Sequence, residues 1–339
     1  MAGSVLELED MRGEGPVLAL DIDGEGLRVA VVRGGAVWMY AGMGVAAGVT
    51  QEIAMYRKGA AVQSARWSPQ PLHTDPDDIL GEYLLAVGKG DGSVTVLCLK
   101  RRERGRREEW ISFSKAKGHK AAICAMSWQK AILVSSSEDR NIVLYGFDLS
   151  AKEPLAVLRT IKTGMEQVIG FCLSANSIFV QDQSGLIRAW ALDTRGKQVL
   201  EVSFQPAQHS FPIRTSPVLC HHWACFPAIP CTNPESGFSL LLVNTDNFDL
   251  CEIPLKQLYP STQAQYQEFV CAVGTARGLV VASSEGVALL DPLALGRPTY
   301  ISALPPFLPP ICAIAALSAT WVVLLGTEAG SVYMIRLIP

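Results

Sequence analysis

Residues 118–145 read GHKAAICAMSWQKAILVSSSEDRNIVLY and contain three strand-like parts in succession. The first part begins at Ile123, and the residue two positions later, Ala125, is small. An apolar run follows at residues 132–134, and the chain turns at Asp139 before an alternating apolar segment. Short aliphatic or β-branched runs bounded by turn residues are typical of β-strands. This stretch therefore predicts three strands of one small antiparallel sheet.

The turn and the strand after it recur along the whole chain, at intervals of 39 to 61 residues. Repeats of roughly this period indicate an architecture built from stacked supersecondary units. The seven turns begin at Gly34, Asp91, Asp139, Ser184, Thr245, Ser284 and Ala329.

Upstream of each turn stands an apolar residue followed, two positions later, by a small one. The pairs are Val17/Ala19, Val62/Ser64, Ile123/Ala125, Val168/Gly170, Val218/Cys220, Phe269/Cys271 and Ile311/Ala313. Small residues at one register are expected on inner strands that crowd around a common axis. Each repeat therefore begins with an inner strand.

A fourth strand is predicted at residues 51–56, 109–113, 154–160, 198–204 and 300–304. In the fifth repeat we expect the second strand at residues 240–243 and the fourth within 256–267. The seventh repeat has no fourth strand, whereas residues 4–9 precede the first repeat without a partner. An N-terminal strand that completes the last sheet closes the ring and leaves no loose edge.

The sequence thus predicts an all-β chain, a single seven-bladed β-propeller whose ring is closed by an N-terminal strand. The approximate blades are 11–57, 58–116, 117–162, 163–206, 207–266, 267–305, and 306–339 completed by 4–10.

The third repeat resembles the WD40-repeat family. Its markers are Gly118, His119, Trp128, Ser135, Asp139 and, where the family usually has Trp, Tyr145. In that family His, Ser, the turn Asp and the strand Trp form a hydrogen-bonded set that stabilises each blade. The resemblance implies such a structural set at His119, Ser135, Asp139 and Tyr145. The fourth repeat carries the usual Trp as Trp190, and the first repeat has Tyr40 at that position.

Composition excludes several broad classes. Hydrophobic residues make up 49% of the chain and charged residues 18%, which excludes disorder of the whole chain. The formal net charge of −3 excludes a general polyanion binder. Residues 298–327 carry no charge, but five prolines interrupt them, so we expect buried strands and no membrane insertion. The N-terminus lacks the basic and apolar regions of a signal peptide.

Candidate chemistry is sparse. The glycine-rich residues 88–93 lie between predicted strands, which favours a hairpin over a phosphate-binding loop. Cys220, His221, His222, Cys225 and Cys231 include zinc-ligand types, but adjacent histidines on a strand point to opposite faces. No catalytic motif is found, and we expect neither an enzyme nor a cofactor. Nine scattered cysteines favour a reducing compartment, the nucleus or cytoplasm.

The most unusual segment is strongly basic. Its cations are Lys100, Arg101, Arg102, Arg104, Arg106 and Arg107. Three interpretations stay open: a solvated linker facing the acidic residues of 70–82, a docking point for an acidic protein or nucleic acid, and a nuclear import signal.

The leading functional prediction is a non-catalytic scaffold that binds other protein subunits of a complex. High hydrophobicity favours covered surfaces, for example at residues 41–50 and 300–310. The alternative is a nucleic-acid-associated propeller that assists a catalytic partner on RNA or DNA through the 100–107 segment.

Overall fold

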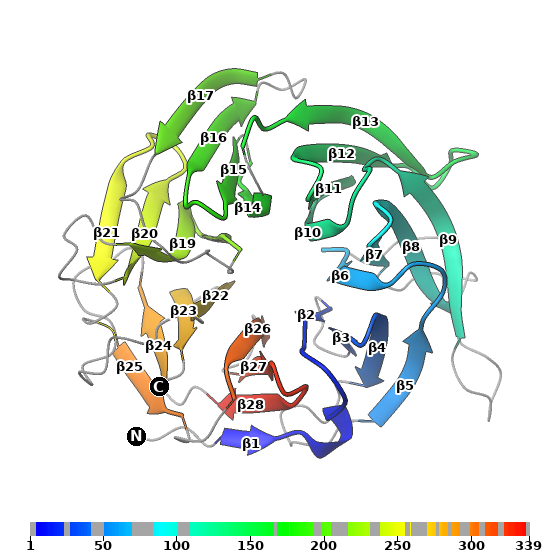
Figure 1. Ribbon diagram of the computed structural model, residues 1–339, viewed down its shortest axis with the longest axis horizontal. Coiled ribbons are helices and arrows are strands. Elements are labelled where there is room, and N and C mark those ends of the chain that lie inside the picture. Colours follow the sequence, from blue (N-terminus) through cyan, green and yellow to red (C-terminus); the bar gives the residue numbers. More distant parts are fainter. Residues whose placement is uncertain are drawn as a thin grey trace. The chain divides into compact units, whose positions relative to one another are not determined.

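The computed structural model describes residues 5–23, 28–41, 51–69, 84–100, 109–165, 168–175, 177–192, 198–204, 216–230, 238–254, 258, 270–275, 278–283, 286–291, 299–304, 309–317 and 322–336. Strands in these ranges form seven four-stranded sheets (Figure 1). A short 3-10 helix, η1 (Glu9–Met11), precedes the first of them in the chain. Seven small antiparallel sheets built from successive strands confirm the predicted fold class, a seven-bladed β-propeller.

The chain divides into two compact units, and the first comprises Leu6–Thr163 and Leu324–Met334. The first sheet contains β2 (Ala19–Ile22), β3 (Arg28–Arg33), β4 (Ala36–Ala41) and β5 (Gln51–Tyr56). The second contains β6 (Val62–Trp67), β7 (Leu85–Lys89), β8 (Ser93–Lys100) and β9 (Glu109–Lys117). The third contains β10 (Ile123–Gln129), β11 (Ile132–Ser137), β12 (Asn141–Phe147) and β13 (Leu155–Lys162).

The second unit comprises Met1–Val5, Gly164–Val323 and Ile335–Pro339. The fourth sheet contains β14 (Val168–Leu173), β15 (Ser177–Asp182), β16 (Ile187–Leu192) and β17 (Gln198–Phe204). The fifth contains β18 (Val218–Cys220), β19 (Trp223–Pro230), β20 (Phe238–Asn244) and β21 (Leu250–Pro254). The sixth contains β22 (Val270–Thr275), β23 (Gly278–Ser283), β24 (Gly286–Leu290) and β25 (Thr299–Ala303).

The seventh sheet confirms the predicted pairing of the N-terminal strand. Its order is β1-β28-β27-β26, with β1 (Val5–Glu7), β26 (Ile311–Leu317), β27 (Val322–Thr327) and β28 (Val332–Arg336). The Leu8 N–H donates to the Val332 carbonyl at 2.9 Å, and the Ser331 hydroxyl donates to the Glu7 carboxylate at 2.9 Å. The strand predicted at residues 4–9 thus covers the edge of β28.

The small residue at the start of the second, third and fourth repeats has a visible cause. In β6, β10 and β14 the register shifts at this position, between Val62 and Ser64, Ile123 and Ala125, and Val168 and Gly170. A β-bulge of this kind bends the inner strand. At Gly170 a Cβ would overlap the Ser216 side chain, which precedes the next sheet. Small side chains therefore let successive inner strands approach one another.

Apolar side chains fill the space between successive sheets of the first unit. Between the first and second sheets these include Val32, Met39, Tyr56, Val62, Leu85 and Val87. Burial of a side chain of this size contributes about 1.5–3 kcal/mol. Successive side chains of a strand point to opposite faces of its sheet, and each face packs against an adjacent sheet. The strands are therefore short apolar runs, which is why such runs predict them.

The fifth sheet corrects one part of the prediction. Residues 240–243 belong to the third strand, β20, and the turn at Thr245 leads into the fourth strand, β21. The second strand is β19, which follows a two-residue turn at His221 and His222. The fourth strand therefore lies before residues 256–267. The prediction failed because the short β18 and the start of β19 were interpreted as one strand.

Among the described residues, no helix is both long and apolar enough to span a bilayer. The uncharged region before Glu328 contains the strands β26 and β27.

Candidate functional site

Four side chains singled out by the WD40 resemblance meet in the third sheet. His119 precedes β10, Ser135 lies on β11, Asp139 in the following turn and Tyr145 on β12. The His119 Nδ1 lies 3.0 Å from Asp139 Oδ1, and its Nε2 lies 2.7 Å from Ser135 Oγ. The Ser135 Oγ is in turn 3.5 Å from the Tyr145 hydroxyl oxygen.

Protonation fixes the direction of these hydrogen bonds. Burial lowers the pKa of His119 and outweighs the opposite effect of Asp139, so the imidazole is neutral at pH 7. Burial alone would raise the pKa of Asp139, but the Lys120 N–H and His119 hold it below its usual value. The ionised Asp139 carboxylate therefore accepts from His119 Nδ1, and His119 Nε2 accepts from the Ser135 hydroxyl. With both ring nitrogens engaged, the set stabilises the sheet.

Gly118 allows this set to form. A Cβ at residue 118 would lie 2.5 Å from the Tyr145 hydroxyl oxygen and 2.8 Å from Val143 Cγ1. Trp190, in contrast, lies on β16 of the fourth sheet, where it is buried opposite Ile178 and Glu201. The structure therefore brings four of the five residues together.

The basic segment is described only at its first residue. The backbone of Lys100 ends β8, opposite Glu109 at the start of β9. Arg101, Arg102, Arg104, Arg106 and Arg107 lie outside the described residues, as do the acidic residues of 70–82. Of the surfaces predicted at residues 41–50 and 300–310, residues 42–50 and 305–308 lie outside them as well.

The zinc-ligand types of the fifth sheet do not converge. Cys220 and Cys225 are buried in the sheet, whereas His221 and His222 form the exposed turn between β18 and β19. His222 Nδ1 lies 3.3 Å from Asp246 on the surface, and Cys231 lies outside the described residues. In the part of the chain that the structure describes, no group of three or more His, Cys, Asp or Glu side chains could hold a metal ion.

The glycine-rich residues 88–93 form the hairpin between β7 and β8, as expected. Asp91 accepts hydrogen bonds from the backbone N–H and the hydroxyl of Ser93, at 3.0 and 2.6 Å. The hydroxyl bond is the main reason that the pKa of Asp91 lies below its usual value.

Sequence analysis missed a buried arginine in the first sheet. Arg33, at the end of β3, donates to the Met11 and Gly330 carbonyls and, at 2.7 Å, to the Tyr40 hydroxyl. A Cβ at Gly13 would lie 2.5 Å from the guanidinium, so a glycine is needed there too. The signal that could have revealed this cluster is Tyr40, because a buried tyrosine hydroxyl needs a polar partner.

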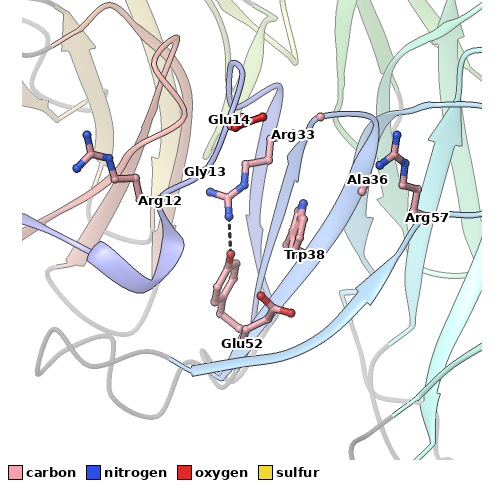
Figure 2. Close-up of a pocket in the computed structure, with 10 residues that line it drawn as sticks. Arg12, Gly13, Glu14, Arg33, Ala36, Trp38, Glu52 and Arg57 are labelled. Carbon is pink, nitrogen blue, oxygen red and sulfur yellow. Dashed lines mark hydrogen bonds between the residues drawn. The ribbon is translucent and has the colours of Figure 1, made fainter.

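This cluster forms the wall of a cavity of about 410 Å³. Figure 2 shows the Arg33 side chain at its centre, beside Trp38, with Arg12 and Arg57 on opposite sides. The Arg33 guanidinium lies 5.4 Å from the centroid of the Trp38 ring. The exposed carboxylates of Glu14 and Glu52 also line the cavity. An aromatic face with charges of both signs suits a polar peptide segment.

Arg66 ties the inner strands of three successive sheets together. Its guanidinium donates to the Leu20 carbonyl on β2 at 3.1 Å and to the Met126 carbonyl on β10 at 3.2 Å. Beside it, Asp21 accepts from the Trp67 N–H at 2.7 Å. Burial raises the pKa of Asp21, although Arg66 acts in the opposite direction. These contacts fix the spacing of the sheets on which the loops are mounted.

Thiol chemistry at neutral pH is disfavoured at the buried cysteines. Burial raises the pKa of Cys124 to about 12, of Cys271 to about 12 and of Cys220 to about 11. These thiols are protonated at neutral pH, and a thiol is a far weaker nucleophile than a thiolate.

Comparison with known proteins identifies the fold only. No family model and no curated protein matches the sequence. A chain in the crystal structure of the mitotic checkpoint complex matches the structure with a TM-score of 0.68 at 12% identity, covering 99% of this chain and 91% of that one. Because 1406 solved chains match, the fold itself does not single out an activity. The likeness agrees with the WD40 resemblance of residues 118–145.

Proposed function

We propose that this chain, a seven-bladed β-propeller that resembles WD40-repeat proteins, is a non-catalytic scaffold subunit of an intracellular multiprotein complex. The solved chain that it resembles is itself part of a multiprotein complex. The neutral, fully engaged His119 and the protonated buried thiols support a role without catalysis. All eight described cysteines are free thiols, which supports a nuclear or cytoplasmic setting.

The observation that carries the proposal is a set of four exposed apolar side chains on the outer strands of the first three sheets. Met55 on β5, Ile111 on β9, and Val157 and Leu158 on β13 are 46%, 40%, 45% and 61% exposed. The outer strands β9 and β13 are in contact, since the Leu155 N–H donates to the Ser114 hydroxyl at 3.2 Å. Exposed apolar groups on neighbouring elements are typical of protein interfaces. We call these four residues the outer apolar stripe.

The test is purification of the tagged chain with its native subunits, followed by cross-linking. The variant Ile111→Lys/Val157→Lys places two charges in the outer apolar stripe. The control Leu18→Lys/Leu250→Lys changes two equally exposed apolar residues elsewhere. We expect the stripe variant to lose a subunit that the control keeps, with equal melting temperatures. Equal subunit recovery by both variants would contradict the stripe as the interface.

A second candidate function is association with nucleic acid through the 100–107 segment. It is favoured by the six cations within eight residues, which are unusual in a chain of net charge −3. Replacing Arg101, Arg102, Arg104, Arg106 and Arg107 with Ser tests it. The wild type should then bind RNA or DNA with a steep dependence on salt that the variant loses. Unchanged oligonucleotide binding by the variant would exclude this segment.

A further inference from the structure

The first unit carries a second basic surface, distinct in sequence from the 100–107 segment. It consists of seven exposed cationic residues at the strand ends where the β3–β4, β7–β8 and β11–β12 turns lie. These residues, which we call the basic rim, are Arg57, Lys58, Lys115, Lys117, Lys120, Arg140 and Lys162. Lys100 and Glu109, in contrast, lie at the opposite end of the β8–β9 ladder from Ser93 and Lys117.

Backbone hydrogen bonds join the segments of the basic rim into one continuous platform. The Gly90 N–H donates to the Ala61 carbonyl at 2.8 Å, and the His119 N–H to the Gly92 carbonyl at 3.3 Å. Further along, the Glu138 N–H donates to the Ala122 carbonyl at 3.1 Å, and the Thr163 N–H donates to the Arg140 carbonyl at 3.2 Å. The cations therefore lie on loops of the first, second and third sheets that backbone hydrogen bonds hold together.

The cations of the basic rim outnumber the carboxylates near them, although Asp91 lies close enough to Lys115 and Lys117 for their charges to lower its pKa. Within the part of the chain that the structure describes, none of the seven side chains forms an ion pair. Asp91 accepts a hydrogen bond from Ser93 and Asp139 accepts one from His119, and both carboxylates keep their negative charge because these donors are neutral. Glu138 is the remaining exposed acid between them. With seven cations against Asp91, Glu138 and Asp139, the platform therefore carries an excess of positive charge in a chain whose net charge is −3.

We propose that the basic rim is a docking surface for an extended, Asp- and Glu-rich segment of a partner protein. This inference rests on the proposed scaffold function and names the chemistry of one partner. Five of the seven cations are lysines, which act as point charges and can each pair with a single carboxylate. The small residues between them, such as Ala61, Gly90 and Ala121, allow a peptide backbone to approach.

Two features of the basic rim disfavour a nucleic acid. Residues 57–61, 89–92, 115–122 and 137–141 contain no Phe, Tyr or Trp on which a base could stack. Asp91, Glu138 and Asp139 also interrupt the positive charge and would repel a continuous phosphate backbone. A peptide with spaced carboxylates can place neutral residues beside these acids.

The test uses the full-length chain and a fluorescent peptide of alternating Glu and Ser, about twelve residues long and thus about 40 Å when extended. The rim variant is Lys117→Glu/Lys162→Glu. The matched control, Lys130→Glu/Lys152→Glu, makes the same charge change at exposed lysines beyond the opposite strand ends of the third sheet. We expect the rim variant to bind the peptide about tenfold more weakly at ~0.1 M salt and the control to bind it like wild type.

Four further results separate the possibilities. Equal peptide affinity of the rim and control variants would overturn the inference. Tighter binding of a single-stranded oligonucleotide or a phosphoserine peptide, lost in the rim variant, would also overturn it in favour of phosphate recognition. If the rim variant keeps every co-purified subunit and the peptide does not bind wild type, the inference fails while the scaffold function stands. If wild type recovers no subunit but binds the peptide through the rim, the scaffold function fails instead.

Discussion

In the third sheet the buried Tyr145 hydroxyl lies beside the Ser135 hydroxyl, which in turn contacts the His119 ring. In the first sheet the buried Tyr40 hydroxyl instead accepts a hydrogen bond from Arg33. The two tyrosines occupy the same place in their repeats. Each lies on the third strand of its sheet and pairs with a residue of the second strand, Tyr145 with Leu133 and Tyr40 with Val29. His119 reaches from the preceding loop into the sheet. Arg33 reaches in the opposite direction, from the sheet to the Met11 carbonyl of the preceding loop.

The difference shows that the fold requires a connection between loop and sheet, and that the residue types can vary. Both connections depend on a glycine at the close approach, Gly118 in one and Gly13 in the other. They differ in charge, because His119 is neutral and Arg33 is a buried cation. The third-sheet connection therefore depends on pH. Four experiments follow from this contrast, in order of decreasing effect.

Arg33→Met should have the largest effect. It leaves the Met11 and Gly330 carbonyls and the Tyr40 hydroxyl without the guanidinium, and we expect the free energy of unfolding to fall by about 3 kcal/mol. The control is Arg57→Met, an exposed arginine of the same cavity, which should change stability by less than ~0.5 kcal/mol. Chemical denaturation measures both, and equal midpoints would show that Arg33 is not a structural connection.

Asp139→Ala should lower the free energy of unfolding by about 2 kcal/mol. The variant removes the acceptor of His119 Nδ1 and of the Lys120 and Asn141 N–H groups. The matched change is Asp148→Ala, whose carboxylate lies in an exposed turn of the same sheet and, among the described residues, accepts hydrogen bonds from Ser150 alone. If Asp139→Ala kept full stability but lost binding of a partner, the set would have a functional role.

Removing the two tyrosine hydroxyls compares the connections directly. Tyr40 receives a charge-assisted bond of 2.7 Å, whereas Tyr145 and Ser135 are 3.5 Å apart. Charge-assisted bonds are about twice as strong as neutral ones, so Tyr40→Phe should be less stable than Tyr145→Phe by about 1 kcal/mol. Thermal unfolding of the two variants under identical conditions measures the difference. The reverse order of stability would contradict the assignment of Arg33 as the stronger connection.

The sequence predicted the fold well because the repeats share a geometric need. The small residue after Val62 or Ile123 marks the bulge of an inner strand, and turn residues mark the hairpins. The fifth sheet was partly wrong because His221 and His222 look like strand residues, although residue 221 has a positive φ of 52°. The Arg33 cluster was missed because a lone arginine before Gly34 looks like an exposed hairpin residue, and only Tyr40, whose buried hydroxyl needs a polar partner, could have indicated it.

The basic rim was also not predicted from the sequence, for a different reason. Its lysines are scattered singly between small residues, from Lys58 to Lys162, and only the backbone bonds between loops bring them together. The 100–107 segment is conspicuous because its cations are consecutive. Local charge density in a sequence therefore identifies a linear segment but not a surface assembled from several turns.

The smallest expected effect is the pH dependence of the third-sheet connection. Because burial holds the pKa of His119 below its usual 6.5, the unfolded chain binds a proton at this residue more readily than the folded chain. Stability contributed by the neutral ring is therefore fully present above about pH 6.5 and is lost as the pH falls below it. We expect His119→Gln to be less stable than wild type at pH 7 but to lose less stability between pH 7 and pH 5. Thermal unfolding at both pH values measures this loss. The control is His222→Gln at an exposed histidine, which should lose as much stability between pH 7 and pH 5 as wild type does. An equal loss in wild type and His119→Gln would mean that His119 is not the group whose protonation weakens the sheet.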